Sequence, residues 1–153
     1  MDDGTLSYSF FDKQLIKSTD KRVEFFMRAQ TLETMTETNM KYPCIFRNML
    51  FKVVAIQFRL VGLEGAELLK YEDDFALDLI IVDHSILFMA LSDMEFVGKR
   101  MFERKLLTPI IISSYEDFRV VLHVGDQLIH KLSDSFCLLK GQVSLMGFRR
   151  LSI

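Results

Sequence analysis

Two apolar runs, ALDLIIV at residues 76–82 and SILFMAL at residues 85–91, are separated only by Asp83-His84. Two strand-length runs joined by so short a polar break are typical of a β-hairpin. Asp78 interrupts the first run with a charge. Because successive side chains of a strand point to opposite faces, we expect Asp78 to face outward. This hairpin makes an antiparallel sheet the starting point for the rest of the chain.

The same alternation recurs on both sides of the hairpin. In residues 118–124, Arg119 and His123 share one parity, and valine and leucine occupy the other, which predicts a strand. Gly125-Asp126 then predicts a turn, with residues 127–132 returning from it. Residues 136–140 and 142–148 flank Gly141 and predict a last hairpin.

Two earlier stretches are ambiguous. Residues 50–61 suit either a buried helix or a long strand, and their β-branched residues together with the Gln57-x-Arg59 alternation favour the strand. Residues 23–30 alternate like a strand but also carry apolar residues at helical spacing, and we favour the strand slightly. Residues 31–39 are rich in threonine and predict an exposed segment or a weak helix.

Residues 93–107 carry Met94, Val97, Met101 and the pair Leu106-Leu107 among charged residues, a spacing that predicts an amphipathic helix. Pro109 would end it, and residues 110–112 would form a short strand. Residues 66–71 predict one or two helical turns. The fold class expected is therefore α+β: a mostly antiparallel β-sheet with one or two short helices, in a single compact domain over residues 21–153. Residues 1–20 show no period and are expected to form an N-terminal arm.

Composition narrows the class of protein. The chain has 153 residues, a formal net charge of −2 and 14 phenylalanines, which argues against disorder and against a strongly basic nucleic-acid-binding domain. No apolar stretch approaches the ~20 residues of a membrane-spanning helix. The first residues are acidic and unlike a secretory leader. We expect a cytoplasmic or nuclear location, or the virion, without secretion.

Few residue patterns point to catalysis. His84, His123 and His130 lack the spacing of metal ligands, although His123 and His130 would face each other across the predicted turn. Cys44 and Cys137 lie among apolar residues, as buried structural thiols do. The scattered glycines form no phosphate-binding loop. We therefore expect no metal and no cofactor, and favour a chain that is not an enzyme.

A cluster of basic residues is the most specific indication of a binding surface in the sequence. Lys99, Arg100, Arg104 and Lys105 fall within seven residues and are interleaved with Met101 and Phe102. Such a cluster suits a solvated helix face, and it also suits contact with anionic lipid or RNA phosphates. Arg149 and Arg150 would add to it.

These features favour a non-catalytic structural or interaction protein that self-associates. Phe10, Phe11, Leu15 and Ile16 of the arm would bury against a neighbouring copy, while the basic residues contact a membrane or a ribonucleoprotein; specific DNA binding is not expected. This layout is similar to that of small β-rich viral matrix and accessory proteins. The alternative is a small ligand-binding or enzymatic domain with its site in a β-sheet cavity, for which Asp78, His84 and His123 are the candidates.

Overall fold

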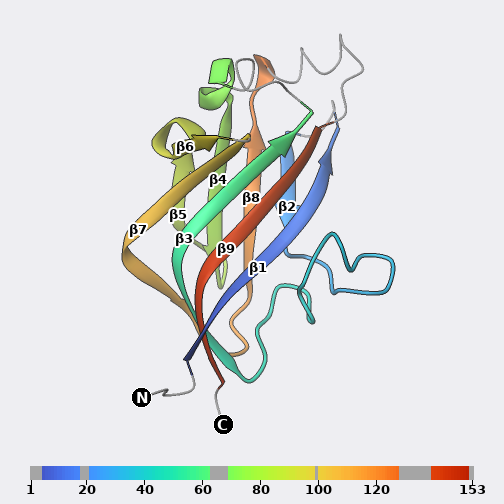
Figure 1. Ribbon diagram of the computed structural model, residues 1–153, viewed down its shortest axis with the longest axis vertical. Coiled ribbons are helices and arrows are strands. Elements are labelled where there is room, and N and C mark those ends of the chain that lie inside the picture. The colour runs from blue at the N-terminus through green and yellow to red at the C-terminus, as the bar shows by residue number, and fades with distance from the viewer. Residues whose placement is uncertain (1–4, 18–20, 63–68, 99, 128–138, 152–153) are drawn as a thin grey trace.

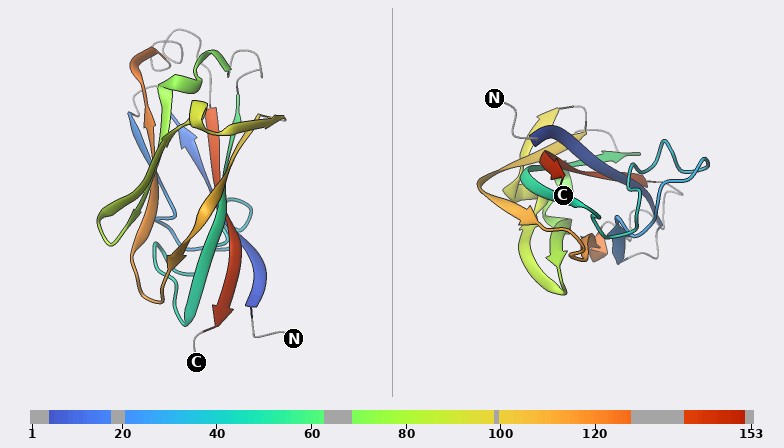
Figure 2. Two further views of the ribbon diagram at one scale, coloured as in Figure 1. Left: turned by 90° about the vertical axis from the view of Figure 1, so that its left-hand side faces the viewer. Right: turned by 90° about the horizontal axis from the view of Figure 1, so that it is seen from below.

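In the computed structural model, which describes residues 5–17, 21–62, 69–98, 100–127 and 139–151, two antiparallel sheets pack face to face (Figure 1). The five-stranded sheet has the order β1-β9-β3-β7-β6 and the four-stranded sheet the order β2-β8-β4-β5. Their strands are β1 Thr5–Ile16, β2 Arg22–Phe25, β3 Met49–Val61, β4 Phe75–Ile81, β5 His84–Ala90, β6 Glu95–Gly98, β7 Met101–Ile112, β8 Phe118–Val124 and β9 Leu139–Leu151. The views of Figure 2 show the two layers and place the start of β1 and the end of β9 at the same end of the molecule.

The expected α+β class is wrong. Helical residues in the described part of the chain are confined to short turns, among them the 3-10 turns η1 Glu72–Asp74 and η2 Leu91–Asp93. The predicted helix over residues 93–107 is instead the hairpin of β6 and β7. Gly98 and Arg100 have φ angles of 88° and 62°, a left-handed conformation that breaks a helix at this point. The apolar residues of 93–107 are spaced as in an amphipathic helix, but this spacing does not correspond to a helix in the structure.

The strand predictions at residues 76–82, 85–91, 118–124 and 50–61 are confirmed by β4, β5, β8 and β3. In residues 23–30 the strand covers only the first part, as β2. Of the helical turns predicted at residues 66–71, Leu69 and Lys70 are helical and Tyr71 is in a turn, whereas residues 66–68 lie outside the described residues. The same holds for residues 128–132 and 136–138.

Gly141 does not turn the chain, so the predicted last hairpin is wrong. β9 runs without a break from Leu139 to Leu151 and lies between β1 and β3. A Cβ atom on Gly141 would lie 3.2 Å from both Ile16 and Phe58 and 3.4 Å from Phe25. The glycine is therefore explained by close packing between the sheets.

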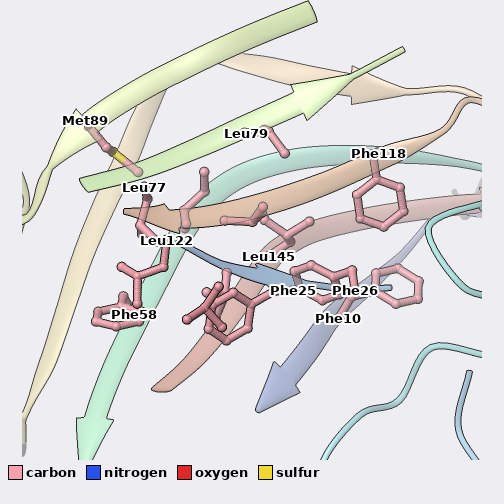
Figure 3. Close-up of a cluster of buried hydrophobic side chains, with 14 of the residues drawn as sticks. Phe10, Phe25, Phe26, Phe58, Leu77, Leu79, Met89, Phe118, Leu122 and Leu145 are labelled. Atoms are coloured by element: carbon pink, nitrogen blue, oxygen red, sulfur yellow. The ribbon is translucent and has the colours of Figure 1, made fainter. Parts of the chain in front are cut away.

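The segment expected as an N-terminal arm contains β1, which pairs with β9 from Thr5 to Ile16. Its inward side chains join the core that fills the space between the sheets (Figure 3). Phe46 lies at the centre of an aromatic group in this core, with its ring centroid 4.5 Å from those of Phe10 and Phe118. Aromatic rings at such separations add to the stabilisation that burial alone provides.

Candidate anion-binding face

The basic residues predicted from the sequence do not form one patch. Lys99 lies outside the described residues, and Arg100 is in the turn before β7. Arg104 lies opposite Ile56 of β3, whereas Arg150 lies opposite Leu50. At about 3.3 Å per residue these positions are roughly 20 Å apart along the sheet.

Two of the predicted cations are also engaged with the protein itself. Arg104 donates from Nη1 to the carbonyl oxygen of Asp93 at 2.9 Å. Arg149 points into the end of the sandwich, with its guanidinium carbon 4.2 Å from the centre of the Tyr8 ring. Of the predicted cations that the structure describes, only Lys105 and Arg150 are exposed on the outward side of the five-stranded sheet.

These two belong to a larger group that sequence reasoning missed. A β-bulge between Val53 and Ala55 shifts the register of β3 against both of its neighbours. Lys52 alternates with buried Phe51 and Val53 before the bulge, and Arg59 alternates with buried residues after it. The extra residue changes the parity, so Lys52 and Arg59 face outward together although one number is even and the other odd. We call the outward cations of this sheet the cationic face: Lys13, Lys52, Arg59, Lys105, Lys140 and Arg150.

A shallow hollow lies at one end of the cationic face. Gln142 of β9 is directly opposite Lys13 of β1 on one side and Arg59 of β3 on the other. With Lys140 and Val61 these side chains line a hollow of about 160 Å³. Since neighbouring strands are about 4.8 Å apart, Lys13 and Arg59 are within reach of one small anion placed over Gln142.

Lys140 is the member of the cationic face that already has a partner. Its Nζ lies 2.7 Å from Oε1 of Glu37, whose other oxygen lies 3.0 Å from Nη2 of Arg28. The bond from Lys140, followed by the bond from Arg28, holds the pKa of Glu37 below its ordinary value. The remaining members have no carboxylate within salt-bridge distance in the described segments.

Aromatic side chains lie among these cations. Phe148 is 41% exposed and lies directly opposite Lys52 on the neighbouring strand. Phe11 is half-buried, and the Nζ of Lys13 lies 6.0 Å from the centre of its ring. Besides Glu37, the acids on the outward side of the strands described are Glu95 and Glu103, which lie opposite each other near the β6 edge, away from both rings. The surface therefore combines partly exposed aromatic rings with cations that have no carboxylate partner among the described residues.

The candidates for an enzymatic site do not converge inside the sandwich. Asp78 faces outward on β4, as its position in the alternation predicted, and Ser85 donates a hydrogen bond to it at 2.5 Å. His84 is exposed, and His123 packs its ring 5.8 Å from that of Phe88 on the outward side of the other sheet. His130 lies outside the described residues. Within the described ranges, no group of three or more histidine, cysteine or acidic residues is arranged to hold a metal ion.

The cysteine thiols offer no activated nucleophile in the part of the chain that is described. Cys44 is a free, half-buried thiol. Burial raises its pKa to about 11, and the hydrogen bond to Asp117 acts in the same direction. Since the thiolate is the reactive form, this environment suppresses reactivity. Cys137 lies outside the described residues.

The residues predicted for self-association are divided between core and surface. Phe10 and Ile16 are buried in the core of their own chain, at 5% and 0% exposure. Phe11 is half-buried on the cationic face, and Leu15 is 46% exposed on the same side of β1. Only the last two offer surface to a second copy.

Comparisons with known proteins give no family. No protein-family model and no curated protein sequence matches the chain. A solved structure of the empty head of turnip yellow mosaic virus shares 8% identity, over 96% of this chain and 82% of that one, with a TM-score of 0.26. A likeness this low carries no argument about either fold or function. Among the described residues, no helix is long and apolar enough to cross a membrane.

Proposed function

We propose that this chain is a non-catalytic binding protein that holds single-stranded nucleic acid against the cationic face of its five-stranded sheet. The observation that carries the proposal is the separation of charge. A chain with a net charge of −2 collects Lys13, Lys52 and Arg59 on one side of one sheet, with no carboxylate of the described residues within salt-bridge distance. Such a field attracts a polyanion even when the net charge of the whole chain does not.

The rings on the cationic face favour a single strand. Proteins that bind single strands combine a positively charged track with aromatic side chains on which bases stack. Phe148 beside Lys52, and Phe11 beside Lys13, supply this combination at two positions along the sheet. A duplex presents grooves that admit a helix or a two-stranded ribbon, which a broad sheet does not resemble.

An anionic membrane is the competing partner for the same cations. Interfacial binding requires apolar side chains that reach into the boundary between headgroups and acyl chains. Phe148 is 41% exposed, and Leu15 and Ile111 on the same side are 46% and 54% exposed. The pairing of rings with cations favours a single strand, and the vesicle arm of the test below decides for or against the membrane.

The test measures the affinity of the full chain for a fluorescent oligouridylate over a range of salt concentrations. Because Lys140 is already paired, about five cations are available, and the slope of log K against log salt should be about −3.5. The double variant Lys13→Gln with Arg59→Gln should weaken binding and reduce the steepness of the slope by about 1.4. Lys21→Gln with Arg22→Gln removes the same charge beside the other sheet and serves as the matched control.

Three results would overturn the proposal. The first is no binding of oligouridylate at low salt. The second is binding that the two double variants weaken equally, which would show that only net charge matters. The third is binding to vesicles containing phosphatidylserine without binding to the oligonucleotide, which would assign the face to a membrane.

Self-association is a separate proposal for the same chain. Deleting residues 1–18 would remove β1, and with it the buried side chains of Phe10 and Ile16, so a loss of mass after this deletion could reflect unfolding. Leu15→Glu changes only an exposed position and is the sharper test. Light scattering on a sizing column should show a mass above 17.9 kDa for the native chain and a lower mass for the variant. A monomeric native chain would refute self-association.

A further inference from the structure

A second feature lies at the end of the sandwich where β1 begins and β9 ends, the end that faces the viewer in the right-hand view of Figure 2. A cavity of about 250 Å³ opens there, between residues 39–49 and the ends of β1, β3 and β9. It is separate from the cationic face, since none of the residues that define that face lines it. An inference about this cavity therefore does not rest on the proposed function.

The rim of the cavity is cationic. Lys41, Arg47 and Arg149 line it, and no carboxylate is found among the described residues of the lining. In the described segments these cations have no carboxylate within salt-bridge distance. A guanidinium is planar and offers a fork of donors that matches phosphate oxygens. The rim is therefore suited to a phosphate group.

Aromatic rings hold the two guanidinium groups of the rim. The carbon of the Arg149 guanidinium lies 4.2 Å from the centre of the Tyr8 ring, and that of Arg47 lies 4.4 Å from the centre of the Tyr42 ring. Stacking on a ring restricts a guanidinium without using its hydrogen-bond donors. Both arginines therefore remain able to bind an anion, and Tyr42, at 40% exposure, offers part of its own surface to a ligand.

The floor of the cavity is apolar and well supported. Phe10, Met40 and Phe46, all at 5% exposure or less, form part of its lining. Asn39 ties the segment above the floor to β1: its Oδ1 accepts a hydrogen bond from the backbone N–H of Phe11, and its Nδ2 donates to the carbonyl of Ser9, both at 2.8 Å. Contacts within the chain thus hold the walls of the cavity in place.

An apolar floor beneath a cationic rim selects a ligand that is a flat ring at one end and an anion at the other. The volume is slightly below the range of roughly 300–1,000 Å³ that is usual for pockets binding drug-sized molecules, which limits the ligand to one such unit. We infer that the cavity binds one nucleoside monophosphate unit, with its base against the apolar floor and Tyr42 and its phosphate between Arg47 and Arg149. Such a unit is available as a free mononucleotide or as the terminal nucleotide of a strand.

The test is an NMR titration of the isotope-labelled full chain with uridine monophosphate. Uridine and inorganic phosphate form separate arms. The amide signals of Tyr42 and Asn48 should shift, and the mononucleotide should bind about tenfold more tightly than either fragment alone. Phosphate binding as tightly as the mononucleotide would overturn the inference, and so would shifts confined to the cationic face.

Substitutions then locate the site. Arg47 is exposed, so Arg47→Gln should leave the fold intact while weakening mononucleotide binding about tenfold; Arg149→Gln should do the same. Arg22→Gln removes one exposed cation from β2 of the other sheet, away from both the cavity and the cationic face, and should leave mononucleotide binding unchanged. Equal effects of Arg47→Gln and Arg22→Gln would refute the site.

A competition experiment identifies the source of the ligand. If the natural ligand is a strand end, a short oligouridylate with a terminal phosphate should displace the mononucleotide, and the same strand with hydroxyl ends should not. If neither strand competes, the ligand is a free mononucleotide; either result supports the site. A chain that binds the mononucleotide here but no oligonucleotide on the sheet would refute the proposed function and leave this inference intact. The reverse result would refute only this inference.

Discussion

Replacing Asp12 tests how the sheet holds the chain that leaves β2. The Asp12 side chain is fully buried, and its Oδ2 accepts hydrogen bonds from the backbone N–H of Phe26 at 2.8 Å and from Gln14 Nε2 at 3.0 Å. Its Oδ1 accepts a longer bond, 3.3 Å, from Arg28 Nε. Phe26 has a φ of 71°, an unfavourable conformation that this bond helps to hold.

The cost of Asp12→Ala follows from these contacts. It leaves the buried N–H of Phe26 without an acceptor, which costs about 1–3 kcal/mol. Arg28 is partly exposed and keeps Glu37 as a partner, so losing the ion pair between Arg28 and Asp12 adds only up to ~1 kcal/mol. We expect Asp12→Ala to lower the free energy of unfolding by about 1–4 kcal/mol. Asp12→Asn keeps an acceptor for Phe26 and should cost about half as much.

Urea unfolding followed by circular dichroism measures both variants. A domain of this size is typically stable by roughly 5–15 kcal/mol, so each variant should still fold. Asp78→Ala is the control, since the bond between Asp78 and Ser85 is exposed, and it should change stability by less than about 1 kcal/mol. The reasoning fails if Asp12→Ala matches the control. It also fails if Asp12→Asn is as damaging as Asp12→Ala, because charge rather than hydrogen bonding would then dominate.

Three further predictions concern the sheet, the thiol and the loop over the cationic face. Gly147→Ala places a Cβ against the backbone carbonyl of Lys52 in β3, which has little freedom to move, whereas the Cβ of Gly141→Ala meets only side-chain atoms. Gly147→Ala should therefore lower the melting temperature more than Gly141→Ala does. Equal decreases in melting temperature would contradict this. Because its pKa is raised from 9.0 to about 11, Cys44 should have a thiolate fraction about 100-fold lower at pH 8 than an ordinary thiol. Mass spectrometry should therefore show slow alkylation of the peptide that contains Cys44. Alkylation at the rate of a free thiol would disprove the effect of burial. The hydrogen bonds from Lys140 and Arg28 lower the pKa of Glu37 in the folded chain. These bonds therefore stabilise the fold at pH values above the pKa that Glu37 has in the unfolded chain, and the stabilisation is lost as the pH falls through the lowered pKa of the folded chain. Glu37→Gln should therefore destabilise the fold at neutral pH but not in acid below that value, in denaturant titrations at the two pH values; an equal loss at both would exclude the ion pairs as the cause.

Local alternation in the sequence determined where several strands lie. Residues 118–124 alternate between core and surface as β8 does, and the runs around Asp83-His84 form the hairpin of β4 and β5. β8 and β4 are short, and the residues of each that face the core or the surface largely alternate, so near neighbours in the sequence contain the information. The same reasoning placed Asp78 correctly on the outward side.

Contacts between distant parts of the chain decided the rest. The apolar residues of 93–107 satisfy a helical period as well, and it is pairing with β3 that selects a strand there. Gly141 has the local character of a turn residue, yet close packing against Ile16 and Phe58 accounts for it. Neither partner is near in the sequence, so no local pattern contains this information.

The cationic face shows the same division. The sequence contains Lys52 and Arg59 as polar members of one strand, but their parity predicts opposite faces. The bulge between Val53 and Ala55 reverses that parity and brings both to one surface, beside Lys13 and Lys140 from strands at the two ends of the chain. The identities of the cations and the alternation of each strand are thus determined by the sequence. Which cations share a surface depends on register and strand order, because those are set by pairing between residues far apart in the chain.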